Sequence, residues 1–270
     1  MSAVKIGLVG AGGRMGRMLI EEVSATEGVA LAAAAERPGY EAIGQDLGTL
    51  AGLKPLGVKL GAEPEAVFKA SDVVIDFTVP KATVAHAAMA AKHKTALVIG
   101  TTGLEAADAA KLRAAGKDIP IVWAPNMSMG VNVLMALVER VAKTLGPDYD
   151  IEILEMHHRH KIDAPSGTAL GLGEAAAKGR GVALDKVAAR GRDGITGARQ
   201  KGAIGFASLR GGDVVGDHYV TFAGEGERLE LVHKASSRRI YSRGAVRAAL
   251  WVKGRKPGVY DMADVLGLRD

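Results

Sequence analysis

A short apolar run followed by a glycine-rich turn opens the chain and limits its fold most strongly. Residues 4–9 read Val-Lys-Ile-Gly-Leu-Val, and residues 10–18 read Gly-Ala-Gly-Gly-Arg-Met-Gly-Arg-Met. Apolar side chains then recur at Leu19, Ile20 and Val23, at the spacing of one helix face. The order strand, glycine turn, helix is typical of folds whose backbone N–H groups approach a pyrophosphate at the helix N-terminus. We therefore expect a parallel α/β sheet that binds a dinucleotide.

The spacing of the glycines departs from the usual Gly-x-Gly-x-x-Gly pattern. After Gly10 and Gly12 the third position falls on Met15, so Gly10, Gly13 and Gly16 make the better frame. A glycine turn alone is weak support for a dinucleotide site, and the interpretation depends on the residues that follow it.

An acidic and a basic residue follow the second expected strand. Residues 29–35 are an apolar run, and Glu36 comes about where an acid bonds the ribose 2′-hydroxyl of a dinucleotide. Arg37 comes next and could pair with a 2′-phosphate instead. The pair leaves the choice between NADH and NADPH open, and a ligand-free turn with an exposed Glu-Arg pair is the alternative.

Further strand-like runs end in small polar loops. Residues 72–78 and 95–99 are apolar and of strand length, with a helical stretch over 81–93 between them. This alternation predicts a parallel sheet with right-handed crossovers, whose ligands bind beyond the carboxyl ends of the strands. Three loops at those ends, at 77–79, 100–103 and 124–128, are candidates for cofactor contact, with ordinary turn chemistry as the alternative. The last two loops contain Gly100, Thr101, Thr102, Ala124, Pro125, Asn126 and Met127.

The second half of the chain has a different pattern. A helical run over 131–145 ends at Gly146-Pro147-Asp148, and residues 149–156 then alternate apolar and polar side chains like a strand with one wet face. A last helical run covers 243–253 and could return to cover the first domain. The β-type runs between them predict a mixed or antiparallel sheet, and they lie at 203–209, 214–222 and 228–233.

At 270 residues, 48% of them hydrophobic, the chain can bury one large core or two ordinary ones. We predict an α/β protein with a Rossmann-type parallel-sheet domain and a second α+β domain with a mixed or antiparallel sheet. The first domain would cover 1–128 and be completed by 239–270, and the second would cover 129–238.

Composition narrows the function classes. The 35 basic and 30 acidic residues give a formal net charge of +5, the cations are dispersed, and only 4% of residues are aromatic. This favours attraction for small polyanions over nucleic acid. The chain has no cysteine, no apolar run long enough to cross a membrane, and no signal-peptide pattern after Met1. We expect a cytoplasmic protein.

A dense charged segment lies between the strand at 149–156 and a helical run at 167–178. It reads His-His-Arg-His-Lys over 157–161 and continues through Asp163 to Pro-Ser-Gly-Thr at 165–168. Imidazoles and a lysine can donate protons near neutral pH, and a helix start binds anions such as carboxylates. Taken alone, the segment could also be a solvated basic loop or a zinc site, although the spacing is not that of zinc proteases.

With these motifs together, the chain resembles the dihydrodipicolinate reductase family nearly end to end, including the stretch 208–212 and Gly-Asp-His at 216–218. The resemblance implies reduction of 4-hydroxy-tetrahydrodipicolinate, a small dicarboxylate, by NADH or NADPH without a metal, in the diaminopimelate route to lysine. It also implies a homotetramer assembled through the second domain, which would bind the substrate. The alternatives are another nicotinamide reductase for a small dicarboxylate or imine, and a non-catalytic, redox-sensing NAD(P)-binding protein.

The resemblance also implies roles for single residues. His157 and Lys161 match the acid/base and proton-donor pair, and His158, Gly167 and Thr168 match substrate contacts. Hydride transfer to an electron-poor ring carbon develops negative charge that must be stabilised and protonated, which suits these side chains. The residues that match dinucleotide contacts are Gly10, Ala11, Gly12, Gly13, Arg14, Met15, Glu36, Arg37, Gly100, Thr101, Thr102, Ala124, Pro125, Asn126 and Met127.

Overall fold

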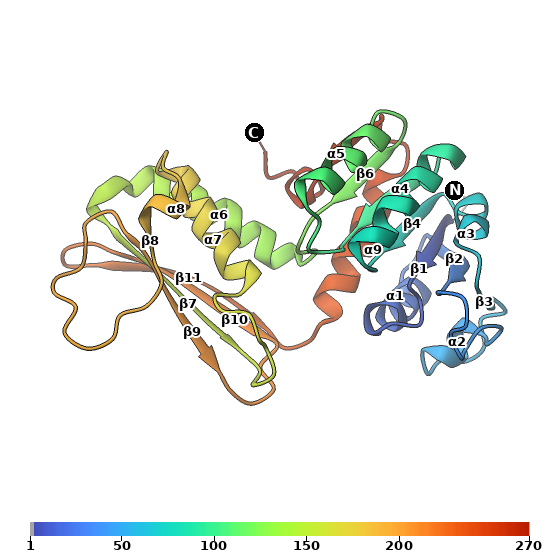
Figure 1. Ribbon diagram of the computed structural model, residues 1–270, viewed down its shortest axis with the longest axis horizontal. Helices are drawn as coiled ribbons and strands as arrows, with labels where there is room; N and C mark the ends of the chain where they lie inside the picture. The colour runs from blue at the N-terminus through green and yellow to red at the C-terminus, as the bar shows by residue number, and fades with distance from the viewer. Residues whose placement is uncertain (1–2, 270) are drawn as a thin grey trace. The chain divides into compact units, whose positions relative to one another are not determined.

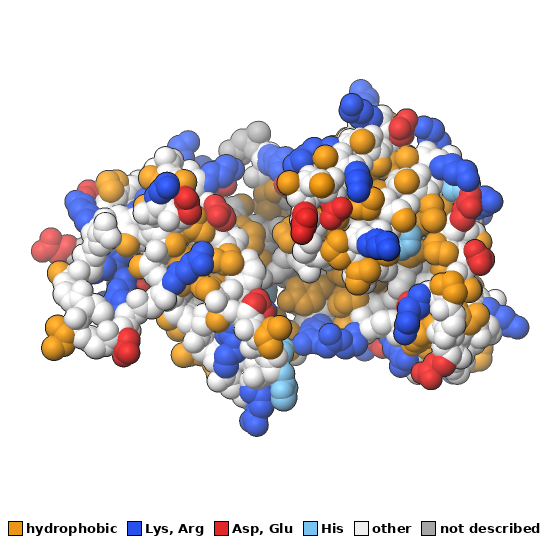
Figure 2. Space-filling model, in the orientation of Figure 1, with side chains coloured by type: hydrophobic (Ala, Val, Ile, Leu, Met, Phe, Trp, Pro, Cys, Tyr) orange, Lys and Arg blue, Asp and Glu red, His pale blue; other side chains and the backbone are white. Residues whose placement is uncertain are grey.

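The computed structural model describes residues 3–269, which form two compact units (Figure 1). The first unit joins the residues up to Met129 to those from Arg239 onward, and the second unit is Gly130–Arg238. Lys and Arg side chains lie at many separate places over the face drawn in Figure 2, with acidic side chains among them. Within residues 3–269, every helix is too short or too polar to cross a lipid bilayer.

The first unit is built on a seven-stranded sheet in the order β12-β6-β5-β4-β1-β2-β3, and every neighbouring pair is parallel. Chain order runs outward from β1 in both directions, so the crevice beyond the carboxyl ends of β1 and β4 is where sheets of this kind bind a dinucleotide. The strands are β1 (Val4–Val9), β2 (Val29–Ala35), β3 (Leu60–Gly61), β4 (Val73–Asp76), β5 (Ala96–Ile99), β6 (Pro120–Trp123) and β12 (Gly258–Tyr260).

Helices cover both faces of this sheet, because its central strands are apolar on both sides. One core joins α1, α2, α9 and α10 to one face, and a second core joins α3, α4 and α5 to the other. The helices are α1 (Arg14–Ala25), α2 (Leu47–Leu50), α3 (Pro64–Ala70), α4 (Pro80–His93), α5 (Ala106–Ala115), α9 (Arg239–Val252) and α10 (Met262–Leu266).

Helix α9 begins earlier than residue 243, where the sequence pattern placed its start. It begins at Arg239, and Ser242 and Gly244 on its first two turns are buried. A Cβ at Gly244 would lie 1.7 Å from the carbonyl oxygen of Met127, so the missing side chain lets α9 pack directly on the loop after β6. Apolar periodicity does not mark the start of α9, because Ser242 and Gly244 carry no large apolar side chain.

The second unit has a five-stranded mixed sheet in the order β11-β10-β7-β9-β8. Strands β11, β10 and β7 pair antiparallel, whereas β9 pairs parallel with both β7 and β8. The predicted fold class, a Rossmann-type sheet with a second mixed-sheet domain, is confirmed. The strands are β7 (Asp150–His157), β8 (Ala188–Ala189), β9 (Ile204–Arg210), β10 (Gly216–Ala223) and β11 (Arg228–Ala235).

Helices pack against one face of this sheet. Buried residues alternate strictly along β7 and β10, as expected when one face carries the core. Ile151 and Phe222 on that face pack with Val138 and Leu172 of the helices. The helical elements are α6 (Met129–Leu145), the 3₁₀ turn η1 (Gly146–Asp148), α7 (Gly167–Gly179) and α8 (Leu184–Val187).

Candidate functional site

The turn between β1 and α1 can be built only from residues without bulky side chains. Gly10 has a φ of +71°, and a Cβ at Gly12 would lie 2.4 Å from the ring of Tyr40. A Cβ at Gly16 would lie 2.5 Å from the backbone of Ala11, so α1 approaches the turn closely. Gly13 is the N-cap of α1 and supplies no side-chain acceptor to the first turn. The turn therefore presents the positive end of α1 to a ligand.

Glu36 lies at this same turn, as the sequence predicted. One carboxylate oxygen accepts a hydrogen bond from the N–H of Gly12 at 3.1 Å, and the other accepts from the N–H of Arg37 at 3.0 Å. The hydroxyl of Tyr40 donates to the carbonyl of Gly12 at 3.1 Å. The end of β2 is thus fixed against the glycine turn, with the side chain of Arg37 exposed beside it.

A buried carboxylate organises the loops at the ends of β4 and β5. Asp76 accepts hydrogen bonds from the N–H and the hydroxyl of Thr78, at 2.9 and 2.6 Å, and its second oxygen lies 2.8 Å from Nδ1 of His86. The hydroxyl of Thr101 is 3.3 Å from Asp76, 2.8 Å from the hydroxyl of Thr83 and 3.0 Å from the N–H of Thr78. Because these groups already engage the Thr101 hydroxyl, a cofactor contact at this position would come from its backbone.

The loop after β6 is anchored by buried side chains and by a hydrogen bond within the loop. Ala124 and Met127 are buried, and Oδ1 of Asn126 accepts from the N–H of Ser128 at 2.8 Å. Pro125 is exposed. The predicted cofactor residues of the first unit therefore lie in the loops that follow the parallel strands β1, β2, β5 and β6, or, for Arg14 and Met15, in the first turn of α1. This is where the fold places dinucleotide ligands.

In the second unit, a fully buried carboxylate holds the end of β7. Oε2 of Glu155 lies 2.5 Å from Nδ1 of His157, and the two oxygens accept from Nη1 and Nη2 of Arg210 at 2.8 and 2.9 Å. Oε1 also accepts from the N–H of Ser166 at 3.2 Å. Burial by itself raises the pKa of the Glu155 carboxyl, but the hydrogen bonds from Arg210 and His157 outweigh it and lower that pKa to about 2.

Glu155 fixes the orientation of His157. An ionised carboxylate only accepts hydrogen bonds, so Nδ1 of His157 carries the proton and donates it to Glu155. This leaves Nε2 directed away from Glu155, and a Cβ at Gly216 would lie only 3.0 Å from it. The arrangement is that of an imidazole oriented by an acid for proton transfer.

A second buried histidine packs against His157. The rings of His157 and His218 meet edge to face with centroids 5.1 Å apart, and Nε2 of His218 lies 3.2 Å from the hydroxyl of Ser166. That hydroxyl also accepts from the N–H of Ala169, so Ser166 caps α7. Burial and the nearby His157 lower the pKa of His218 to about 4, which keeps this ring neutral near pH 7.

The helix α7 begins beside this pair. Gly167 and Thr168 are its first two residues, and a Cβ built on Gly167 meets no described atom within 4 Å. N–H groups at a helix start point out of its positive end. Open space at Gly167 and the buried cap at Ser166 together give an anion access to this end of α7.

Lys161 and His158 complete the group. Nζ of Lys161 lies 2.8 Å from Oδ1 of Asp163, and the Lys161 hydrogen bond lowers the pKa of Asp163. Nη2 of Arg238 lies 3.3 Å from Nε2 of His158, whose Nδ1 is buried without a hydrogen-bond partner among residues 3–269. Burial, and then the positive charge of Arg238, lower the pKa of His158. Donation by Arg238 leaves Nδ1–H of a neutral His158 to serve a ligand.

The structure adds residues to which the sequence assigned no role: Glu155, Arg210, His218 and Arg238. Glu155 could have been found, because it lies two residues before His157 and so on the same face of a strand. Arg210 and His218 depend on strand pairing, which places Arg210 opposite His157 and His218 opposite Glu155. Among the residues described, no three His, Asp or Glu side chains are grouped to hold a metal ion.

Two sequence models of one protein family match almost the whole chain. Residues 4–127 match the model described as dihydrodipicolinate reductase, N-terminus. Residues 130–266 match the model described as dihydrodipicolinate reductase, C-terminus. The two matches adjoin at the first boundary between the compact units, after Met129, and the second match continues past Arg238 into the C-terminal part of the first unit.

Curated relatives match along their full length. The 4-hydroxy-tetrahydrodipicolinate reductase of Rhodopseudomonas palustris (strain BisB18) is 57% identical over 270 residues, which are 100% of both chains. The protein of the same name from Parvibaculum lavamentivorans is 58% identical over 266 residues, 98% of both chains. In fold, the chain is similar to a dipicolinate-bound dihydrodipicolinate reductase from Paenisporosarcina sp. TG-14, with a TM-score of 0.75, 23% identity, and coverage of 97% of this chain and 99% of that one.

Proposed function

The chain belongs to the dihydrodipicolinate reductase family, and we propose how its residues carry out the reduction of 4-hydroxy-tetrahydrodipicolinate. The protein is an oxidoreductase of lysine biosynthesis through diaminopimelate, and it uses a nicotinamide cofactor. The resemblance drawn from the sequence motifs is confirmed. The observation that carries the assignment of residues is the buried Glu155–His157 pair beside the start of α7.

The reaction adds one hydride and one proton to the substrate ring and releases the 4-hydroxyl group as water. The cofactor, when bound, supplies the hydride. Lys161 is proposed as the proton donor, and His157 as the acid/base that works with it. The fixed tautomer of His157 supports this, because Glu155 leaves only Nε2 of that ring to exchange a proton with the substrate.

The substrate is a dicarboxylate, and the second unit offers groups for its charges. The backbone N–H groups of Gly167 and Thr168 at the start of α7 would hold one carboxylate. Nδ1–H of His158 would donate to the same ligand, since Arg238 occupies the other nitrogen of that ring. The positive charges of Lys161 and Arg238 further favour a dianion at this place.

The residues of the first unit fit a dinucleotide. A pyrophosphate requires close approach of the backbone, and the turn at Gly10, Gly12 and Gly13 leaves no Cβ in its way. Glu36 is held at this turn, where an acid bonds a ribose hydroxyl, and the exposed Arg37 is placed for a 2′-phosphate. We propose that the protein accepts both NADH and NADPH.

Replacing Arg37 by alanine is expected to raise the Kd for NADPH about tenfold and to change the Kd for NADH less than twofold. The reason is that a hydrogen-bonded charge pair with the 2′-phosphate exists only for NADPH. Fluorescence titration of both cofactors measures this, with Lys111→Ala, which removes an exposed cation of α5, as the control. Equal weakening of both cofactors would remove Arg37 from phosphate recognition.

A homotetramer is proposed through the open face of the five-stranded sheet. Leu209 on β9 and Val232 on β11 are 48% and 45% exposed, and the pairing register places them on the face opposite the core. Tyr219 and Met156 lie on the same face. The same face also carries Glu152, Asp217 and Lys234, so it mixes apolar and charged side chains, as interfaces between copies of a chain commonly do.

The double substitution Leu209→Glu with Val232→Glu is expected to dissociate the assembly, because it buries unpaired charges at the proposed interface. Light scattering coupled to size-exclusion chromatography measures the mass. The matched control, Val133→Glu with Leu137→Glu, places two charges at exposed apolar residues of α6. A wild-type protein that elutes as a monomer, or a double variant that keeps the wild-type mass, would contradict the proposal.

The proposed activity is tested by following nicotinamide absorbance with freshly generated substrate, in parallel with NADH and with NADPH. Oxidation of either cofactor that depends on the substrate supports it. A panel of other small dicarboxylates and imines tests whether a different reductase activity is faster. Cofactor binding without turnover of any of these would favour the redox-sensing alternative.

A further inference from the structure

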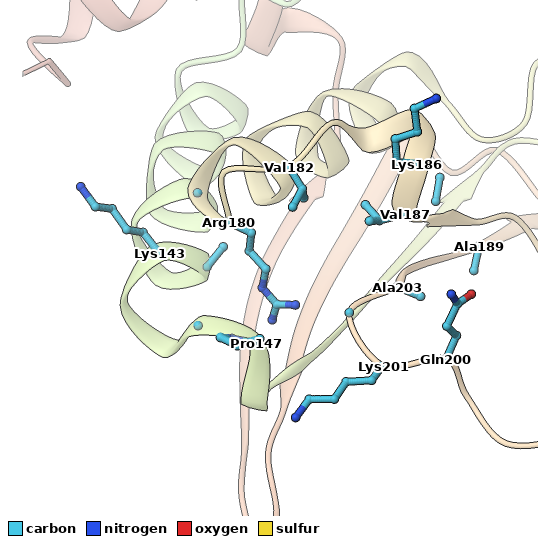
Figure 3. A pocket seen from close by; sticks show the side chains of 15 residues that line it. Lys143, Pro147, Arg180, Val182, Lys186, Val187, Ala189, Gln200, Lys201 and Ala203 are labelled. Carbon is cyan, nitrogen blue, oxygen red and sulfur yellow. The ribbon is translucent and has the colours of Figure 1, made fainter.

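The second unit contains a cavity of about 390 Å³ to which the proposed reaction assigns no role. Its walls are the C-terminal ends of α6 and α7, the short helix α8, strand β8 and the residues that precede β9 (Figure 3). None of its described lining residues belongs to the segment from Glu155 to Thr168 or to the cofactor loops. It is therefore distinct from the groups that serve the reduction.

A partly buried arginine with two unpaired guanidinium nitrogens lines this cavity. Figure 3 shows the side chain of Arg180, the C-cap of α7, extending into it. Nη2 of Arg180 donates to the backbone carbonyl of Tyr149, but Nε and Nη1 are buried and have no acceptor among residues 3–269. The acid that acts on Arg180 through its charge, Asp150, forms an ion pair with Arg199 at 2.6 Å. A guanidinium stays protonated and offers five N–H donors, so leaving two nitrogens unpaired is costly.

The charged residues that line the cavity are all basic. Lys143, Lys186 and Lys201 also line it, and none of its described lining residues is acidic. Asp148 lies 3.5 Å from Lys201 and Asp185 lies 3.6 Å from Lys186, in pairs that are well exposed on both sides. Such exposed ion pairs have a small interaction energy and are screened by salt, so they do not neutralise the guanidinium of Arg180. The cavity remains a place of positive potential.

We propose that this cavity binds a small oxyanion, a carboxylate or a phosphate, through the free donors of Arg180. Charge-assisted hydrogen bonds from a guanidinium are the usual way in which proteins hold both groups. Val182 and Val187 contribute apolar side chains to the wall of the cavity. Its volume leaves room for a short hydrocarbon chain attached to the anionic group. The ligand class is a small anionic metabolite, which fills the unmet hydrogen bonds and offsets the buried charge.

The test follows the methyl NMR signals of Val182 and Val187 in the full-length protein. Inorganic phosphate and succinate are titrated separately, with sodium chloride at matched ionic strength as the reference. Ile162 reports on the substrate segment, so binding of succinate there is recognised as a separate event. Arg180→Gln removes the guanidinium, and Arg140→Gln removes an exposed cation of α6 as the matched control.

We expect saturable shifts at Val182 and Val187 in the wild type and in Arg140→Gln, and a loss of affinity of about tenfold or more in Arg180→Gln. Saturation by phosphate alone or by succinate alone supports the site and assigns its ligand class. Two results overturn the proposal: no saturable shift with either anion in the wild type, or shifts that sodium chloride reproduces. The wild-type titration alone shows whether either of these results occurs. The test therefore does not depend on the folding of Arg180→Gln or on turnover.

Discussion

Replacing Lys161 by alanine is expected to lower kcat by about 100-fold or more, while the Kd for the nicotinamide cofactor stays within about twofold. General acid catalysis is typically worth this range, and the cofactor residues lie in the other unit of the chain. Stopped-flow or steady-state absorbance gives kcat, and fluorescence titration gives the cofactor Kd. The matched control is Lys178→Ala, which removes an ion-paired lysine from the surface of the same unit.

A second substitution separates proton donation from charge. Lys161→Arg keeps the cation near Asp163 but offers a group that does not give up its proton. If Lys161 donates the proton, the arginine variant is as slow as the alanine variant. If Lys161 acts only through its charge, the arginine variant recovers most of the activity. A near-normal kcat for Lys161→Ala would remove the residue from the mechanism.

The sequence predicts the first unit well because its signals are local. The turn at Gly10 and Gly13 depends on missing side chains, and Glu36 lies at the end of the very next strand. The alternation of strand and helix then fixes a parallel sheet and the edge at which the loops gather. Strand order and helix faces follow from a small set of allowed topologies, so few alternatives remain.

The direction of single side chains is less predictable, even where the position is right. Thr101 lies at the end of β5 as expected, but its hydroxyl bonds to Asp76, Thr83 and the N–H of Thr78. These partners come from separate loops and a helix, and no local pattern relates them. A threonine at a strand end therefore indicates the edge of the sheet without indicating which of its groups faces a ligand.

The proton-transfer group around His157 could be predicted only in part, because the sequence does not give the register of the strands. His157, His158 and Lys161 lie within five consecutive residues, so the sequence predicts them together. The carboxylate that orients His157 receives its ion-pair partner Arg210 from 55 residues away, through the parallel pairing of β7 with β9. A shift of one residue in that pairing would move Arg210 to the other face of the sheet.

Replacing Glu155 by glutamine is expected to lower kcat about tenfold to 100-fold and to destabilise the second unit by about 3 kcal/mol. The carboxylate uses both oxygens, one for His157 and Arg210 and the other for Arg210 and Ser166. An amide has a single acceptor oxygen, so a buried donor loses its partner and the Nδ1–H tautomer of His157 is no longer enforced.

The pH dependence of stability distinguishes this carboxylate from the histidines near it. The folded-state pKa of Glu155 is lowered from 4.5 to about 2, so its contribution is complete above pH 4.5 and is lost as the pH falls toward 2. The pKa of His218 is lowered from 6.5 to about 4. The stability that depends on its neutral ring is therefore lost at higher pH than that of Glu155, as the pH falls from 6.5 to 4. Denaturation at several pH values should therefore show the wild type losing its advantage over Glu155→Gln below pH 4.5.

Glu152→Gln is the matched control, because Glu152 lies on the same strand and also accepts hydrogen bonds from arginines, at 2.9 Å from Arg192 and 2.8 Å from Arg199. It is half-exposed and far from His157 along β7, so its loss should leave kcat and the pH profile of kcat unchanged. For Glu155→Gln we expect that profile to shift, since the acid that orients His157 is gone. A kcat within twofold of wild type, with an unshifted profile, would show that the buried carboxylate holds β7 and β9 together without positioning the imidazole for proton transfer.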